Sequence, residues 1–240
     1  MAVVEVVDHG RWAEVILNRP ERRNAINGPL GEALTSAIRR ADADDGVQAI
    51  LLRGAEGAFC SGLDLKAFNA EPPPDWMPRF STIWRGAHKA IFECRKPVVV
   101  ALERFAINGG AALALAADLL VAGENAFLHV GEVRQGMAAP YNLAWLRFRH
   151  SESVAAQLTL TGRRFTGSEL VALGVAYAVA PDDVVVATAI RLVEEVAAYP
   201  DGALARIKTQ LRAYNDASAD DWFDRATRHA APRMKPRAVE

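Results

Sequence analysis

Two glycine-containing segments of the chain each stand where a strand would pass into a helix. The first is GAEGAFCSGLDL, residues 54–65, and the second is FAINGGAALALAADL, residues 105–119. At such a junction the free backbone N–H groups point away from the chain and can donate hydrogen bonds to a ligand oxygen. Two junctions that meet in space would form an oxyanion hole with two donors. Glycine at the end of a strand is also, and more commonly, a matter of turn geometry.

The motifs of several familiar kinds of site are missing from the sequence. Neither glycine segment has the Gly-Lys-Ser/Thr ending of a P-loop or the G-x-G-x-x-G spacing of a dinucleotide site. There is no G-x-S-x-G elbow, and Ser61 has no partner that the sequence identifies, so a serine hydrolase is not favoured. Two cysteines and five scattered histidines predict neither a disulfide framework nor a metal site.

The composition is that of a soluble globular protein. The 240 residues fit one domain, and a net charge of -1 gives no electrostatic reason to expect a nucleic-acid partner. The longest apolar stretch, residues 111–122, is interrupted by Asp118 and is shorter than the roughly 20 residues that span a bilayer, so we expect no membrane partner. The N-terminus, MAVVEVVDHG, carries acids where a secretory signal has basic residues, and we therefore expect a cytoplasmic protein.

The residue pattern predicts an α/β fold with a largely parallel sheet. VVEVVD and WAEVILN are rich in β-branched residues and predict a hairpin, and residues 28–44 place Leu30, Leu34 and Ile38 on one helical face. VQAILLRG and KPVVVALE are short apolar runs, which is typical of strands buried on both faces. Strands that alternate with helices favour a parallel sheet.

The remaining segments are less regular. Residues 67–82 contain four prolines and predict either a mobile cover over a site or a surface excursion. From Tyr141 onward the pattern is mainly helical. TGSE, residues 166–169, has the spacing of a capping box, and PDDVVVATAIRLVEEVAAYP has the proline and acids that the start of a helix prefers.

Five ordered segments resemble the enoyl-CoA hydratase/isomerase (crotonase) superfamily. They are LNRPERRNAINGPL, GAFCSGLDL, KPVVVALERFAINGGAALALAADLLVAG, GEVRQGM and TGRRFTGSELVALGVAYAVAP, and the match runs over about residues 12–185. The resemblance implies a crotonase-like spiral of ββα units over residues 1–185 and, in the same structural unit, a helical C-terminal trimerisation region over residues 186–240. It also implies an acyl-CoA thioester as the partner, with coenzyme A as part of the substrate and no separate cofactor, and a homotrimer or dimer of trimers.

The resemblance gives the glycine segments a role. The backbone N–H groups of Ser61 and Gly109 would donate to the thioester carbonyl, so the Ser61 side chain need not be a nucleophile. ERRNAI matches the stretch that wraps the adenine end of coenzyme A, chiefly through backbone groups around Arg23 and Ala25. Arg22 and Arg23 would face the phosphates or simply be solvated, and Lys66 has the same two interpretations.

Hydratases of this family hold water between two glutamates, and this chain resembles one with a glutamate removed. The position three residues after the oxyanion glycine is Ala112, whereas the later position is Glu132. Each acid/base group contributes typically about a hundredfold to ten-thousandfold, so efficient hydration is not expected. One carboxylate suffices to shift a double bond from position 3 to position 2, because both proton positions lie on one face of the dienolate.

A second resemblance supports this choice of reaction. GEVRQGMAAPYNLAWL, residues 131–146, looks like the mitochondrial-type 3,2-enoyl-CoA isomerases, which also have an apolar residue where Ala112 stands. A glutamate in a loop is most commonly a solvated surface group. If Glu132 is a base, an apolar pocket would raise its pKa, and four residues could supply one: Phe127, Met137, Pro140 and Tyr141.

Six residues are expected to form the acyl pocket, although aromatic residues at this spacing are also typical of a core: Trp76, Phe80, Trp84, Ala112, Met137 and Tyr141. Two other functions remain open. One is a hydratase, decarboxylase or hydrolase of the same type that uses Glu132, His129 or Tyr141. The other is an acyl-CoA-binding protein that has lost catalysis. The sequence also leaves open whether the C-terminal helices cover their own subunit's site or a neighbour's.

Overall fold

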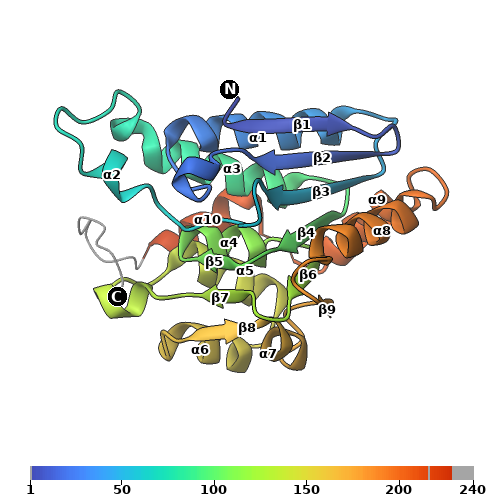
Figure 1. Ribbon diagram of the computed structural model, residues 1–240. Coiled ribbons are helices and arrows are strands. Elements are labelled where there is room, and N and C mark those ends of the chain that lie inside the picture. The colour runs from blue at the N-terminus through green and yellow to red at the C-terminus, as the bar shows by residue number, and fades with distance from the viewer. Residues whose placement is uncertain (1, 216, 229–240) are drawn as a thin grey trace.

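A six-stranded sheet forms the centre of the computed structural model, which describes residues 2–215 and 217–228 (Figure 1). The spatial order of the strands is β1-β2-β3-β4-β6-β9; β1 and β2 form the predicted antiparallel hairpin, and the other pairs are parallel. The strands are β1 (Val4–Asp8), β2 (Trp12–Leu17), β3 (Ala49–Gly54), β4 (Val98–Leu102), β6 (Leu119–Gly123) and β9 (Ala178–Ala180).

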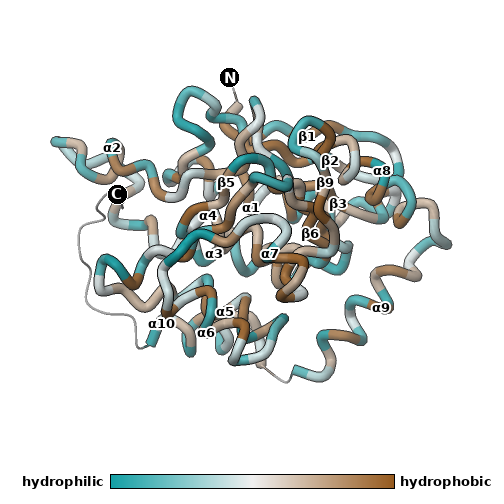
Figure 2. The backbone as a smooth tube through the Cα atoms, turned by 60° about the horizontal axis from the view of Figure 1, so that its bottom comes forward, coloured by the Kyte–Doolittle hydropathy of each residue, from teal (hydrophilic) through white to brown (hydrophobic). Residues whose placement is uncertain are grey.

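Strand β3 shows why its sequence is a continuous apolar run. Ile50 and Leu52 face the main core, whereas Ala49 and Leu51 belong to a second cluster that packs against α8 (Val185–Ala197). Successive side chains of a strand point to opposite faces, so a strand covered on both sides has no polar face. Figure 2 shows the hydrophobic residues gathered along β3 and β6. The prediction of doubly buried strands is confirmed.

A smaller sheet lies beside the first and carries part of the chain toward the candidate site. It consists of β5 (Phe105–Ile107), β7 (Phe127–His129) and β8 (Arg164–Thr166), in the order β5-β7-β8. Isolated parallel bridges join Ile26 to Leu63 and Cys60 to Ala106. The segment after β3 is thereby tied to β5, which leads into α4 (Gly109–Leu115).

The helices cover the sheets and agree with most of the sequence pattern. Leu30, Leu34 and Ile38 of α1 are fully buried, and the Thr166–Glu169 capping box is present at α7. No helix within the described ranges is long and apolar enough to cross a membrane. The other helices and 3-10 turns are α1 (Gly28–Ala43), α2 (Leu65–Phe68), α3 (Phe80–Glu93), α5 (Pro140–Arg149), α6 (Glu152–Leu160), α7 (Gly167–Ala172), α9 (Ala203–Arg212), α10 (Ala219–Thr227), η1 (Pro20–Arg22), η2 (Met77–Arg79) and η3 (Glu132–Gln135).

The start of α8 differs from the prediction. The proline and acids expected in its first turn, Pro181 to Asp183, precede a helix that begins at Val185. The Asp182 carboxylate instead accepts hydrogen bonds from the backbone N–H and the side-chain amide of Asn125, at 3.0 and 2.8 Å. This tertiary contact gives the carboxylate donors outside the helix, so it does not cap α8.

The C-terminal helix α10 packs on α3 and α5 of its own chain. The Trp222 indole N–H donates to the Ala144 carbonyl at 3.1 Å, and Asp220 pairs with Lys89 at 2.7 Å and Arg85 at 3.0 Å. Within the described residues, the C-terminal region therefore covers elements of its own subunit. Residues 229–240 of the predicted C-terminal region lie outside the described ranges.

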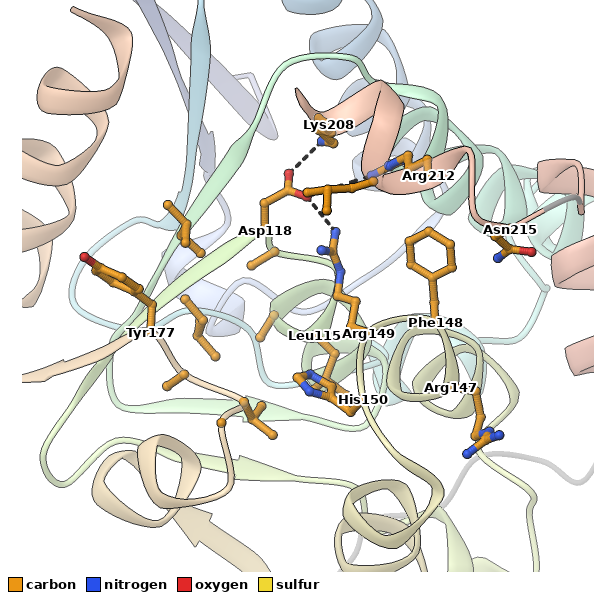
Figure 3. Close-up of a pocket in the computed structure, with 18 of the residues that line it drawn as sticks. Leu115, Asp118, Arg147, Phe148, Arg149, His150, Tyr177, Lys208, Arg212 and Asn215 are labelled. Atoms are coloured by element: carbon orange, nitrogen blue, oxygen red, sulfur yellow. Dashed lines mark hydrogen bonds and ion pairs between the residues drawn. The ribbon is translucent and has the colours of Figure 1, made fainter. Parts of the chain in front are cut away.

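One carboxylate anchors α9 to the rest of the fold (Figure 3). Asp118 accepts from Lys208 at 2.6 Å and Arg149 at 3.0 Å, and Arg212 lies 4.0 Å away. Its Oδ2 also accepts from the Val98 N–H at 2.8 Å. Burial alone would raise the pKa of Asp118, but the charges of Lys208 and Arg149 lower it to about 2. The group therefore stabilises the fold above the pKa of an unfolded aspartate and loses this effect as the pH falls.

Asp118→Asn should lower the free energy of unfolding at pH 7 by about 3 kcal/mol, because it leaves three cations without their carboxylate. Urea denaturation at pH 7 and pH 3 measures this, and the difference between variant and wild type should shrink at pH 3. The control is Glu152→Gln, which removes an exposed pair with Arg147 at 3.6 Å and should cost less than about 1 kcal/mol. Equal losses in the two variants would contradict the anchoring role.

Candidate active site

The two glycine segments lie against each other through backbone contacts that are too close to admit a side chain. A Cβ atom on Gly110 would lie 2.5 Å from the Cys60 carbonyl oxygen. Gly62 has a φ of +89°, and a Cβ there would lie 2.8 Å from the Ile107 carbonyl oxygen. Only glycine permits this conformation and this approach. The segment around residue 61 is thus held against the start of α4, as the oxyanion-hole hypothesis requires.

The two expected donors are in different situations. Gly109 is the first residue of α4, where N–H groups have no partner four residues earlier within the helix. The Ser61 N–H donates to the Arg23 carbonyl at 3.1 Å. Sequence reasoning did not anticipate this bond. A ligand oxygen at Ser61 would have to share this N–H with the Arg23 carbonyl or displace it.

A cavity of about 480 Å³ opens beside these segments and collects most of the predicted site residues. Its walls come from the loop before α1, the residue-61 segment, α3, α4, η3 and α5. Ten predicted residues line it: Arg23, Ser61, Phe80, Trp84, Gly109, Ala112, Glu132, Met137, Pro140 and Tyr141.

Several predicted residues lie elsewhere. Arg22 pairs with Asp64 at 3.5 Å, and Lys66 is exposed outside the cavity. Ala25 is buried, and its carbonyl accepts a hydrogen bond from Arg19. Trp76 is not among the lining residues of the cavity.

Two aromatic side chains pack outside the cavity with other rings. The Trp76 ring lies 5.3 Å from Phe68 and 5.7 Å from Phe80, so it supports the pocket wall from behind. Phe127, expected beside Glu132, packs instead against Phe105 at 6.1 Å. Strand pairing explains this, because Phe127 lies directly opposite Phe105 in the smaller sheet.

Glu132 lies buried at the start of η3, three residues after β7. Only 8% of it is exposed, and its Oε1 accepts a hydrogen bond from the Asn142 amide at 2.9 Å. Its Oε2 has no hydrogen-bond partner among the described residues. Burial raises the pKa of Glu132 to about 7, although its own backbone N–H and the bond from Asn142 oppose this rise. A carboxyl group with this pKa can both accept and return a proton near neutral pH.

The other polar groups of the cavity are less suited to proton transfer. Ala112, one helical turn after Gly109, supplies no carboxylate, and Glu132 is the only acid among the described lining residues. His129 bonds through Nε2 to the Gly162 carbonyl at 3.0 Å, and burial lowers its pKa. Burial raises the pKa of Tyr141 to about 12, and its ring stacks on His88 at 4.5 Å.

Sequence reasoning missed two asparagines that contact the candidate base or its segment. Asn142 donates to Glu132, and the Asn108 side chain accepts from the Gly131 N–H at 2.8 Å. A signal for Asn142 was present, because it precedes Trp145 and Leu146 by three and four residues and so lies on the same buried helix face. A polar residue on such a face needs a partner.

The described residues contain no group of three or more histidine, cysteine or acidic side chains arranged to hold a metal ion. A larger cavity of about 750 Å³ lies around the Asp118 cluster. Its lining does not include Gly109 or Glu132. Of these two cavities, the one of 480 Å³ therefore combines Gly109 with the buried acid Glu132.

Comparison with known proteins places this chain in a family. The family model described as enoyl-CoA hydratase/isomerase matches residues 10–227. A Thermus thermophilus protein assigned as an enoyl-CoA hydratase is 35% identical over 90% of this chain and 87% of its own. The chain belongs to the enoyl-CoA hydratase/isomerase family.

Two further comparisons agree. The mitochondrial Δ(3,5)-Δ(2,4)-dienoyl-CoA isomerase of Rattus norvegicus is 30% identical over 88% of this chain and 68% of its own. The crystal structure of a carnitinyl-CoA hydratase from Mycobacterium avium has a TM-score of 0.83 at 28% identity, covering 95% of this chain and 88% of that one. The predicted crotonase-like α/β fold is confirmed.

Glu132→Gln should make the protein more stable than the wild type above pH 7. The folded protein holds this proton up to about pH 7, whereas an unperturbed glutamate has a pKa of 4.5. The free energy of unfolding of the wild type therefore falls by about 3 kcal/mol as the pH rises between these values. The variant lacks this decrease.

Urea denaturation of both proteins from pH 4.5 to pH 8.5 measures the difference. Glu124→Gln, at an exposed position, should follow the wild type at every pH. A constant difference between Glu132→Gln and wild type across this range would show that Glu132 titrates normally.

Proposed function

We propose that this protein is an enoyl-CoA isomerase that converts a 3-enoyl-CoA to a 2-enoyl-CoA. The observation that carries the proposal is the single carboxyl group, Glu132, in a cavity that also presents the Gly109 N–H. Hydration by two carboxyl groups would need a second acid near Ala112, and the described lining residues contain none. One acid is sufficient for a proton transfer that begins and ends on the same substrate.

The reaction balances within the substrate. Ionised Glu132 removes a proton from C2 of the thioester, and the electron pair moves into a dienolate with negative charge on the thioester oxygen. The N–H group of Gly109 would stabilise this charge, and that of Ser61 would join it by exchanging its bond to the Arg23 carbonyl for one to the substrate oxygen. Such donors are each worth about a hundredfold to a thousandfold in rate. The same carboxyl group then returns the proton to C4, which leaves the double bond between C2 and C3. No metal or redox cofactor enters this sequence of steps.

The cavity provides matching surfaces for the rest of the substrate. Arg23 lines the cavity and would contribute a positive charge for the coenzyme A phosphates. The acyl chain would lie against a group of apolar and aromatic side chains that line the same space: Phe80, Trp84, Met137 and Tyr141. By family resemblance we also propose assembly into a trimer or a dimer of trimers, and a cytoplasmic location.

A hydratase is the second candidate, because most of the curated relatives carry that name. It would have to activate water with Glu132 alone. The rat relative supports the first candidate, because it is named a dienoyl-CoA isomerase and is as similar to this chain, at 30% identity, as several of the hydratases. A non-catalytic acyl-CoA-binding protein is a weaker third candidate. Burial destabilises the ionised form of Glu132 and raises its pKa to about 7. Binding an acyl-CoA without catalysis does not require such a group.

Purified protein should convert a 3-enoyl-CoA faster than it hydrates a 2-enoyl-CoA, as followed by the absorbance of the conjugated thioester. Glu132→Gln should lower the isomerase rate by about a hundredfold to ten-thousandfold, because it removes the proton carrier. Glu132 must be ionised in the free enzyme to accept a proton, so kcat/KM of the wild type should rise with pH through about 7. Rapid hydration with little isomerisation would establish the hydratase instead, and binding without turnover would establish the third candidate.

Ala112→Glu should raise the ratio of hydration to isomerisation, because it places a second carboxyl group one helical turn from Gly109 in the same cavity. Ala112→Gln is the matched control, since it has nearly the same size and no acid. Both rates are measured on the two substrates above. A ratio that stays the same in both variants would contradict the alignment of Ala112 with the missing acid.

A further inference from the structure

Asn142 is fully committed as a hydrogen-bond donor at the base of the cavity. It is the third residue of α5, and only 2% of it is exposed. Its side-chain amide donates to Glu132 Oε1 at 2.9 Å and to the Asn108 carbonyl at 3.2 Å. The two amide hydrogens therefore connect the candidate base directly to the residue before Gly109.

Asn108 makes further bonds to the segment that carries Glu132. Its N–H donates to the His129 carbonyl at 2.8 Å, and its Oδ1 accepts from the Gly131 N–H at 2.8 Å. Its backbone has a φ of 50° and a ψ of -110°, which is an uncommon conformation outside glycine. These bonds help to hold it in that conformation, at the point where β5 turns into α4.

The two oxygens of Glu132 are consequently not equivalent. Oε1 is held by Asn142, whereas Oε2 has no partner among the described residues. A carboxyl group free to rotate could present either oxygen to a substrate. The bond from Asn142 fixes the plane of the group and leaves one oxygen for proton transfer.

We propose that Asn142 is a positioning residue that, together with Asn108, fixes Glu132 relative to Gly109 and makes Oε2 the oxygen that transfers the proton. The predicted changes in kcat rest on the proposed function. The hydrogen bond between Asn142 and Glu132 and its effect on the pKa of Glu132 do not depend on the substrate. A displacement of about 1 Å between reacting groups costs about a hundredfold in rate, so a single bond that sets this distance has a large effect.

The same bond affects the titration of Glu132. A donor to the ionised form favours that form, so removing Asn142 should move the pKa of Glu132 further above its ordinary value. The other titratable or charged groups that line the cavity are Arg23, His129, Tyr141 and Arg164. Burial lowers the pKa of His129 and raises that of Tyr141 to about 12, so both are largely neutral where Glu132 titrates.

The experiment replaces Asn142 with leucine, which has a similar shape and no donor, and with aspartate, which places a like charge beside Glu132. Asn142→Leu should lower kcat for the 3-enoyl-CoA by about a hundredfold, with KM changed less than about threefold. The midpoint of the rise of kcat with pH should move up by about one pH unit in both variants. Leu143→Ala, at the next position of α5 and outside the cavity lining, is the control for general weakening of the helix and should keep the wild-type midpoint.

Carboxyl ¹³C NMR of the substrate-free protein gives a readout that does not depend on turnover. The midpoint of the Glu132 resonance should be higher in Asn142→Leu than in the wild type. If the two midpoints agree and kcat is unchanged, the positioning role is overturned. If the wild type isomerises no 3-enoyl-CoA but the NMR midpoint still shifts, the proposed function fails while the contact between Asn142 and Glu132 stands. If Asn142→Leu does not fold, Asn142→Ala supplies the same two measurements, because it also removes the donor and adds no charge.

Discussion

The site depends on a close backbone contact between the turn after β3 and the start of α4. Gly110 lies so near the Cys60 carbonyl, and Gly62 so near that of Ile107, that any side chain would separate the two segments. The contact fixes where the N–H groups of Ser61 and Gly109 lie. The contact also positions Ala112 and Glu132, because α4 carries Ala112 and β5 is paired with the strand that leads to Glu132.

Glu132 is a buried acid whose ionised form is unfavourable and whose carboxyl group is held in one orientation by Asn142. An ionised carboxylate in an apolar site is unfavourable, and its own backbone N–H and the bond from Asn142 recover this free energy only in part. The result is a group that changes its charge near neutral pH. Because the acid is unsatisfied at Oε2, stability is given up at the place where a substrate would bind.

The walls of the cavity are secured from outside by elements that contribute nothing to its chemistry. Helix α10 packs across α3 and α5, which carry Trp84 and Tyr141. Asp118 joins β6 to α9 through a cluster of cations, in a separate cavity. These contacts explain how short strands and a seven-residue α4 can present a site with fixed geometry.

The sequence alone determined the hairpin, the doubly buried strands, α1, the capping box and the family, because hydrophobic period, turn chemistry and ordered motifs are local or collinear properties. It also pointed to Glu132 and Gly109. Only the tertiary structure decided that Arg22, Lys66, Trp76 and Phe127 lie outside the cavity lining, that Ser61 donates to Arg23, and that Asn108 and Asn142 hold the base. Such facts depend on distances between residues far apart in the chain, which no local pattern records.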